Sequence, residues 1–275
     1  MNFCKMHGLG NDFILLNGMD NPIDDYTQLA QKLCHRNLGI GADGILIVLP
    51  SKIADIRMRI INSDGSEANM CGNGIRCFAK YVFEKKIIAK EKFTIETFAG
   101  IIKPELMIQN NKISAIKVDM GKPNLERAEI PMLGKKGAVI SEPIKVDNET
   151  YSITSMLMGV PHSMIFVDNI DSAPVESLGP KIEKHESFPK KTNVNFVEVL
   201  NRKEISVKTW ERGAGMTYAC GTGSCASVVA SYLTGQTDRN VTVHLKYGDL
   251  VIDFLEDNTV FMTGPAEEVF CGVTL

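Results

Sequence analysis

One short pattern occurs twice in this chain of 275 residues: a Cys-Gly-Xaa-Gly turn that runs directly into a helical pattern. The first copy begins at Cys71 and the second at Cys220, close to half a chain length further on. After each turn, apolar residues recur at the i, i+3, i+4 and i+7 positions of an amphipathic helix. A repeat at this distance predicts two related domains, although the two halves share little other sequence.

Each turn combines a thiol with the start of a helix, and this combination has a chemical use. A helix N-terminus has unpaired N–H groups and a partial positive charge, which stabilise a thiolate and can hold a carboxylate. A cysteine beside a glycine turn is more often a small buried residue without a chemical role. Because the whole setting is duplicated, we interpret Cys71 and Cys220 as a paired acid and base.

Length and composition indicate a two-domain protein that acts on a small molecule. A chain of 275 residues is long for one compact domain but sufficient for two with separate cores. The formal net charge of −3 gives no reason to expect binding to nucleic acid or to a membrane surface. The N-terminus has no signal-peptide pattern, and no apolar run reaches membrane-spanning length. We therefore expect a cytoplasmic protein with no nucleic-acid or membrane partner.

The seven cysteines give no sign of a disulfide framework or of a metal site. Their number is odd, and a reducing compartment would keep them as thiols. The nearest cysteine pairs lack the C-x-x-C spacing, and the five histidines do not cluster. The glycine turns also differ from phosphate-binding loops. We expect no disulfide scaffold, no metal and no nucleotide.

Short alternating segments outnumber helical ones, which is typical of half-buried strands. The clearest are residues 56–61, 93–98, 113–118, 205–210, 241–247 and 250–254. An amphipathic pattern beginning at Tyr26 predicts a helix that ends near Gly39, and the polar run 181–191 is expected to be a solvated loop. Strands and helices do not alternate regularly, so we predict an α+β fold with antiparallel or mixed sheets.

Longer motifs resemble one known family. The residues around Cys71 read N-S-D-G-S-E-A-N-M-C-G-N-G-I-R, and those around Cys220 read E-R-G-A-G-M-T-Y-A-C-G-T-G. Both resemble the signatures of the diaminopimelate epimerase family. The resemblance continues in K-M-H-G-L-G-N-D-F near the N-terminus, G-I-G-A-D-G from Gly39, M-G-V-P-H from Met158 and N-V-N-F from Asn193, so it spans nearly the whole chain.

The resemblance implies a cofactor-independent enzyme that interconverts LL- and meso-2,6-diaminopimelate on the route to lysine and peptidoglycan precursors. It implies two pseudo-symmetric mixed α/β domains, each with strands wrapped around a central helix, and an active site in the interdomain cleft. We place the boundary where a strand pattern meets Gly and Pro, which gives domains 1–118 and 119–262. The family's C-terminal strand returns to the first half, so residues 263–275 are assigned to the first domain. Family members typically form homodimers, and we expect one here.

The resemblance also implies residue roles. Cys71 and Cys220 would be the thiolate base and the thiol acid on opposite faces of the substrate α-carbon, and their roles would exchange with reaction direction. His162 and Glu211 would assist proton transfer, although His162 can also be read as a structural histidine. The residues that would bind substrate are Asn11, Asn62, Gly72, Asn73, Asn193, Glu211, Arg212, Gly221 and Thr222. No metal and no pyridoxal phosphate would be required.

The remaining cysteines and histidines are expected to have no part in catalysis. Cys77 and Cys225 lie inside the two predicted helices, where packing is their expected role. We expect structural roles for His7, His35, His185 and His244.

Two positions depart from the family pattern. Val160 stands where many members have Asn, and Gly44 stands where some have Gln. Both changes remove groups that can hydrogen-bond substrate, so substrate identity is less firmly implied than reaction type.

Two other functions remain open. A related two-cysteine racemase would use the same chemistry on proline or hydroxyproline, but Asn73 stands where those relatives have His. A non-catalytic amino-acid-binding protein would keep both cysteines only for packing. If the two thiols face one carbon, mild oxidation is also expected to join Cys71 and Cys220 once the cleft closes.

Overall fold

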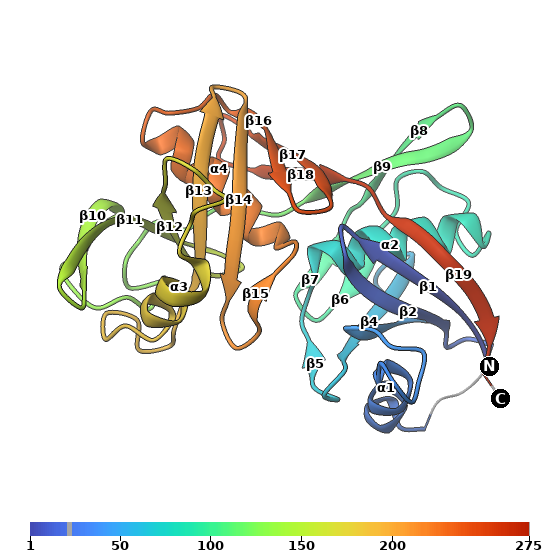
Figure 1. The fold of residues 1–275 in the computed structure, drawn as a ribbon. Coiled ribbons are helices and arrows are strands. Elements are labelled where there is room, and N and C mark those ends of the chain that lie inside the picture. The colour runs from blue at the N-terminus through green and yellow to red at the C-terminus, as the bar shows by residue number, and fades with distance from the viewer. Residues whose placement is uncertain (21–23, 275) are drawn as a thin grey trace. The chain divides into compact units, whose positions relative to one another are not determined.

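A computed structural model describes residues 1–20 and 24–274 of the chain (Figure 1). The chain forms two compact units. The first consists of Met1–Asp119 and Thr263–Leu275, and the second of Met120–Met262. Each copy of the Cys-Gly-Xaa-Gly turn therefore belongs to its own unit.

The first unit is built on one mixed sheet with the strand order β19-β1-β2-β3-β4-β6-β7, and β5 pairs with β4. Neighbouring strands are antiparallel except for β2 with β3 and β4 with β6, which are parallel. β8 and β9 form an antiparallel hairpin. The strands are β1 Asn2–Gly8, β2 Asn11–Asn17, β3 Gly44–Leu49, β4 Ile56–Asn62, β5 Glu67–Ala68, β6 Ile95–Thr97, β7 Gly100–Ile102, β8 Glu105–Gln109, β9 Lys112–Asp119 and β19 Glu267–Val273.

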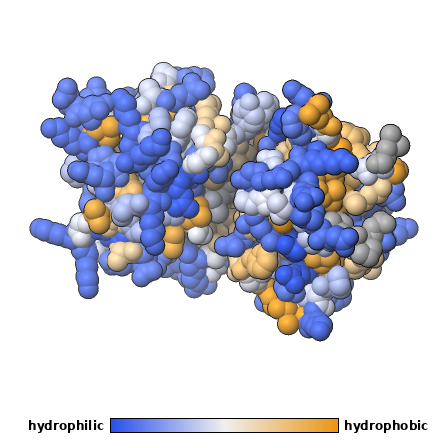
Figure 2. All heavy atoms as spheres, turned by 90° about the horizontal axis from the view of Figure 1, so that it is seen from below, coloured by the Kyte–Doolittle hydropathy of each residue, from blue (hydrophilic) through white to orange (hydrophobic). Residues whose placement is uncertain are grey.

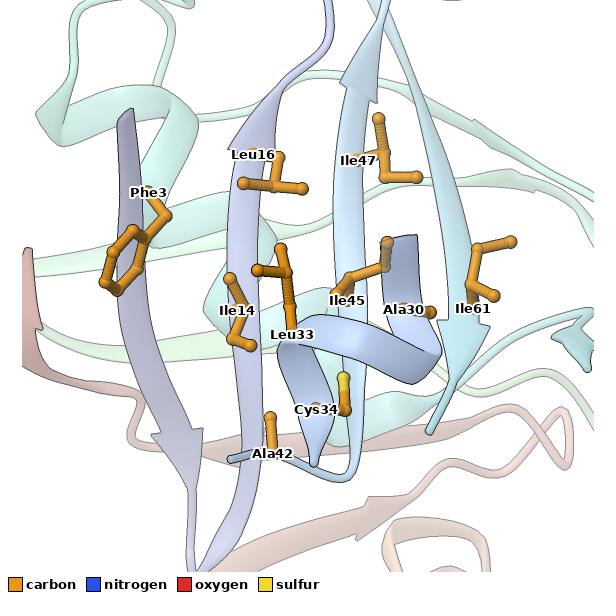
Figure 3. Packing of buried hydrophobic residues seen from close by; sticks show 10 residues of the cluster. All are labelled: Phe3, Ile14, Leu16, Ala30, Leu33, Cys34, Ala42, Ile45, Ile47 and Ile61. Carbon is orange, nitrogen blue, oxygen red and sulfur yellow. The ribbon is translucent and has the colours of Figure 1, made fainter. Parts of the chain in front are cut away.

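Helix α1 (Tyr26–Cys34) packs against β3 and β4. The helix begins after Asp25, whose side chain accepts a hydrogen bond from the Gln28 N–H and so satisfies a free donor of the first turn. Its apolar face joins alternate residues of the strands, since successive strand side chains point to opposite faces. Figure 3 shows this core, made by Phe3, Ile14, Leu16, Ala30, Leu33, Cys34, Ala42, Ile45, Ile47 and Ile61.

Helix α2 (Gly72–Glu84) is the central helix of the first unit and begins at the first Cys-Gly turn. It contacts β1, β2, β3 and β9. Every residue from Gly72 to Ala79 is buried, including Arg76. The guanidinium of Arg76 donates from Nε to the Pro265 carbonyl at 3.0 Å, which offsets the cost of burying this charge.

The second unit is built on the strand order β10-β11-β12-β13-β14-β16-β17-β18, and β15 pairs with β14. Its strands are β10 Val139–Val146, β11 Glu149–Met158, β12 Val160–Phe166, β13 Asn193–Asn201, β14 Glu204–Glu211, β15 Gly215–Thr217, β16 Asn240–Leu245, β17 Gly248–Phe254 and β18 Val260–Gly264. Parallel pairing of β12 with β13 places His162 opposite Asn193.

Helix α4 (Gly221–Leu233) is the central helix of the second unit and contacts strands β11 to β14, β16 and β17. It is almost entirely buried and rich in small residues, which lets strands approach it closely. Ser224, Ser227 and Ser231 each donate their hydroxyl to the carbonyl four residues earlier. These bonds satisfy polar groups that would otherwise destabilise a buried helix.

The predicted α+β class with few helices is confirmed, as are helices at both Cys-Gly turns and near Tyr26. The strand expected at 93–98 covers only Ile95–Thr97. The expectation of a loop at 181–191 is wrong at its start, because helix α3 (Val175–Glu183) extends to Glu183. This helix was not predicted, since Gly179 and Pro180 interrupt its apolar pattern. Glycine is required at position 179 because a Cβ there would lie 2.7 Å from the Trp210 side chain.

The expectation that all cysteines are thiols is also wrong, because Cys4 and Cys271 form a disulfide within the first unit. Cys34 and Cys77 are free thiols. Hydrophilic residues cover most of the face drawn in Figure 2, with hydrophobic residues in separate small groups. Within residues 1–20 and 24–274, no helix is long and apolar enough to cross a membrane.

Candidate active site

Cys71 is the N-cap residue of α2. Its backbone is extended (φ −143°, ψ 119°), and its sulfur accepts a hydrogen bond from the Gly74 N–H at 3.4 Å. The side chain is only partly buried, so a small molecule can reach it. A sulfur in this position receives both a backbone donor and the positive end of the helix, which together stabilise a thiolate.

Asn11 lies beside the Cys71 sulfur, and its orientation can be derived. Its Nδ2 donates to Asp43 Oδ2 at 2.7 Å, and a carboxylate can only accept, so Oδ1 must point the other way. That oxygen lies 3.6 Å from Cys71 Sγ and accepts from Asn73 Nδ2 at 3.2 Å. Because an amide oxygen can only accept, it bonds Cys71 only when that thiol is protonated, and it therefore opposes the stabilisation of a thiolate by the helix end.

Asp43 is held by an ion-pair network behind Asn11. Arg36 donates to Asp43 at 2.8 Å and to Asp12 at 2.9 Å, and Lys5 lies 2.7 Å from Asp12. Burial alone would raise the pKa of Asp12, but hydrogen bonds from Arg36 and Lys5 lower it to about 2. Asp12 is thus charged at neutral pH and holds Arg36, the cation that bonds Asp43.

Two predicted positions border this site along β3 and β4. Asn62 lies opposite Gly44 in the strand register, and its Nδ2 donates to Ser66 Oγ at 3.0 Å. A Cβ at Gly44 would lie 2.7 Å from the Ile61 carbonyl oxygen. The local backbone therefore fits glycine at this position, and a glutamine would require it to move.

Cys220 is the N-cap residue of α4, with an extended backbone (φ −111°, ψ 106°). Its carbonyl accepts the first helical hydrogen bond, from the Ser224 N–H at 2.9 Å. Cys220 is buried, with 6% of the residue exposed. Gly223 makes the turn possible, because a Cβ there would lie 3.2 Å from the Cys220 sulfur.

A buried chain of hydrogen bonds leads to Cys220. The Thr222 hydroxyl lies 3.6 Å from Cys220 Sγ and 3.0 Å from His162 Nε2. On the other side of the ring, Asn195 Nδ2 lies 3.2 Å from His162 Nδ1. The Thr209 hydroxyl donates to Asn195 Oδ1 at 3.0 Å, which directs the Asn195 amide nitrogen toward the ring.

The protonation of His162 fixes the direction of this chain. The ring is fully buried, and this desolvation, together with the nearby charge of Arg212, lowers its pKa to about 3, so it is neutral near pH 7. Because Nδ1 accepts from Asn195, the single proton is on Nε2 and is donated to Thr222. The Thr222 hydroxyl is then free to donate to Cys220. The surroundings of Cys220 therefore suit a thiolate.

The charged pair at the end of β14 is also anchored. Thr217 Oγ1 donates to Glu211 Oε1 at 2.5 Å, and the Arg212 N–H donates to Asn193 Oδ1 at 2.7 Å. The Arg212 guanidinium donates to the Lys190 carbonyl at 2.8 Å. Asn193 thus positions the backbone from which Arg212 projects.

The predicted residues fall into three local groups. In the first unit, Asn11, Asn73 and Gly72 gather at Cys71; in the second, Thr222, Gly221 and His162 gather at Cys220, and Asn193 joins Arg212 beside Glu211. Sequence reasoning missed Asp43, Asn195 and Thr209. The first two lie within the quoted motifs G-I-G-A-D-G and N-V-N-F, which was the available signal. Cys77 and Cys225 are completely buried, in agreement with a packing role.

One group of side chains could in principle bind a metal ion among the residues that the structure describes: Cys4, Glu268 and Cys271. Its two sulfurs are bonded to each other, so they offer no thiolate to a cation. The group lies in the first unit and does not include Cys71.

Solved structures define the fold class. A phenazine biosynthesis protein of the PhzF family from Bacillus anthracis is similar over 100% of this chain and 99% of its own, with a TM-score of 0.72 and 18% identity. A hydroxyproline epimerase from Agrobacterium vitis is similar over 99% of this chain and 90% of its own, with a TM-score of 0.69 and 15% identity. The chain has the two-domain fold shared by these proteins.

Sequence comparison identifies the family. The family model for diaminopimelate epimerase matches residues 3–126 and 154–269. The diaminopimelate epimerase of Caldanaerobacter subterraneus subsp. tengcongensis is 54% identical over 272 residues, which cover 99% of this chain and 98% of that protein. The chain belongs to the diaminopimelate epimerase family and is an isomerase.

Proposed function

We propose that this enzyme interconverts LL- and meso-2,6-diaminopimelate with Cys71 and Cys220 as its two acid–base groups. Family membership supports the substrate. The observation that carries the mechanism is that each cysteine caps the N-terminus of a buried central helix and has its own polar partner. Asn11 is placed to accept from Cys71, and Thr222 is placed to donate to Cys220.

The reaction moves one proton on each side of a single carbon. One thiolate removes the α-proton and becomes a thiol, and the other thiol donates its proton to the opposite face and becomes a thiolate. The intermediate carbanion needs fixed dipoles, since the proposed mechanism uses no cofactor as an electron sink. The N–H groups of the first turns, at Gly72 and Asn73 in α2 and at Gly221 and Thr222 in α4, would hold the α-carboxylate and stabilise this charge.

The remaining predicted residues would bind the other polar groups of the substrate. Arg212 would bind a carboxylate and Glu211 an ammonium, which are the groups of an amino-acid substrate. Asn11, Asn62 and Asn193 would add hydrogen bonds. His162 would act through Thr222 as a neutral donor and would not itself release a proton, because burial keeps its ring uncharged.

We further propose a cytoplasmic homodimer that needs no metal and no other cofactor. The two units would correspond to the two domains expected from the sequence, 1–118 with 263–275 and 119–262. Lysine and peptidoglycan precursors are made from soluble metabolites, which fits this location.

The test is α-deuterium incorporation from D2O into LL-diaminopimelate without added cofactor, together with the stereochemistry of the product. Cys71→Ala and Cys220→Ala are each expected to lose racemisation by at least a thousandfold. The matched controls are Cys77→Ala and Cys225→Ala, which remove cysteines from inside the same helices and should retain activity.

Three results would contradict the proposal in different ways. Activity in both catalytic-cysteine variants would overturn the mechanism. Equal losses in the control variants would show that helix packing, and not thiol chemistry, is being measured. Turnover of proline or hydroxyproline with none of diaminopimelate would keep the mechanism and replace the substrate.

A further inference from the structure

A disulfide joins the first and last strands of the sheet in the first unit. Cys4 in β1 and Cys271 in β19 lie directly opposite each other in the antiparallel register, and the bond spans a sequence separation of 267. β1 lies between β19 and β2 in the sheet, whereas β19 is an edge strand whose side chains are mostly exposed. The bond therefore fixes an edge strand to the interior of the sheet.

The two sulfurs differ in their access to solvent. Cys4 is 4% exposed, whereas Cys271 is exposed on the edge strand. A cavity of about 490 Å³ borders both residues and is also lined by Asp20, Tyr81 and Lys85. A small molecule that enters this cavity reaches Cys271 more readily than Cys4.

A positive charge lies at the exposed sulfur. Lys85 Nζ is 3.4 Å from Cys271 Sγ and 3.2 Å from Glu268 Oε2. The carboxylates of Glu268 and Asp20 also face this site, so the cavity does not select for anions. An ammonium group this close to the sulfur stabilises the negative charge that spreads over the sulfurs during thiol–disulfide exchange. The cavity thus combines an accessible disulfide with a cation.

The edge strand is also connected to the helix that carries Cys71. Arg76 Nε donates to the Pro265 carbonyl at 3.0 Å, and Lys80 Nζ donates to the Ala266 carbonyl at 2.8 Å. Lys85 follows the last turn of the same helix. Two cations of α2 therefore hold the segment that leads into β19, Lys85 contacts β19 itself, and the disulfide joins this strand to β1.

We propose that Cys271 is a thiol-exchange site for low-molecular-weight thiols, and that the cavity beside Lys85 receives them. The thiolate of the incoming molecule attacks Cys271 Sγ, the bond to Cys4 breaks, and Cys4 leaves as a thiolate that takes a proton from water. A second thiol then attacks the mixed disulfide, which releases Cys271 and one oxidised dimer of the small thiol. Two small thiols are oxidised and one protein disulfide is reduced, so electrons balance.

Exchange removes the covalent link between β19 and β1, and the edge strand is then held only by non-covalent contacts. A disulfide that closes a long loop contributes much of its stabilisation by restricting the unfolded chain. Its reduction is expected to lower the thermal midpoint by roughly 5–10 °C and to increase amide hydrogen exchange in residues 265–274.

The test treats the oxidised full-length protein with glutathione at a fixed thiolate concentration. Peptide mass spectrometry is expected to find glutathione on Cys271 before any appears on Cys4. Lys85→Gln should slow this reaction at least severalfold, while Lys86→Gln, at the next position, should keep the wild-type rate.

Several results would overturn the proposal. These are a protein that forms no Cys4–Cys271 bond after mild oxidation, a bond that resists millimolar thiol, first labelling at Cys4, or an unchanged rate in Lys85→Gln. None of these readouts depends on the epimerase reaction, so the outcome is independent of the proposed function.

Discussion

The buried neutral ring of His162 makes the stability of the second unit depend on pH. Its pKa in the folded protein is about 3, compared with the ordinary value of 6.5. As pH falls below 6.5, the unfolded chain binds a proton at this residue and the folded chain does not. The unfolding free energy must therefore decrease between about pH 6.5 and pH 3.

The size of the effect follows from the same two values. Each pH unit inside this window lowers the unfolding free energy by about 1.36 kcal/mol. Between pH 7.5 and pH 4.5 the loss is roughly 2–3 kcal/mol, which is a large part of a typical domain stability of roughly 5–15 kcal/mol. Asp12 does not obscure this window, because its lowered pKa adds stability that is lost only below about pH 4.

The chain offers a local probe for the measurement. Trp210 is the single tryptophan, and its Nε1 donates to Glu183 Oε2 at 2.8 Å within the second unit. Its fluorescence during urea unfolding therefore reports on the unit that contains His162. Titrations at several values between pH 7.5 and pH 4.5 give the unfolding free energy at each.

The decisive comparison is with His162→Gln, which cannot be protonated. The wild type is expected to lose roughly 2–3 kcal/mol more than this variant between pH 7.5 and pH 4.5. His35→Gln removes a histidine from the first unit and should show the same slope as the wild type. Parallel pH profiles for the wild type and His162→Gln would refute the assignment of a neutral buried ring.

Two further predictions concern the surroundings of Cys220. Thr222→Ala should slow iodoacetamide alkylation of Cys220 at pH 7 by roughly tenfold, because a hydrogen bond to a charged group contributes about 1.5–3 kcal/mol. Thr222→Ser keeps the hydroxyl and should alkylate at nearly the wild-type rate. Unchanged alkylation in the alanine variant would show that Thr222 does not donate to the sulfur. Gly223→Ala should reduce racemisation roughly tenfold or more, because its Cβ would lie 2.4 Å from Asn195 Oδ1. Gly74→Ala should lose less activity, because the nearest atom to its Cβ would be 3.3 Å away. Equal losses of activity in the D2O assay would contradict this prediction.

Sequence reasoning succeeded where the signal was local and periodic. The helices after Cys71 and Cys220 have regular apolar spacing and begin at glycine turns, and both signals lie within a few residues. The regular strands at 56–61 and 205–210 were found for the same reason. Helix α3 was missed because its short pattern contains Gly179 and Pro180, and its stability depends on contact with Trp210, which is distant in sequence.

The polar partners of the cysteines could not be found in this way. Asp43 acts on Cys71 only through the orientation of Asn11, and Asn195 acts on Cys220 only through His162 and Thr222. Such chains of hydrogen bonds form only when particular strands are neighbours and pair in a particular register. The same holds for the disulfide, because nothing local places Cys4 opposite Cys271.

The two halves repeat a turn but not its chemistry, and this difference bears on the resting protonation of the enzyme. Asp43 forces the Asn11 oxygen toward Cys71, which favours a thiol there, while neutral His162 leaves the Thr222 hydroxyl free to donate to Cys220, which favours a thiolate. A two-base epimerase needs one protonated and one ionised thiol before substrate binds. Because the two cysteines have different polar partners, the resting enzyme would favour a thiol at Cys71 and a thiolate at Cys220. Cys220 would then be the base that meets the first substrate.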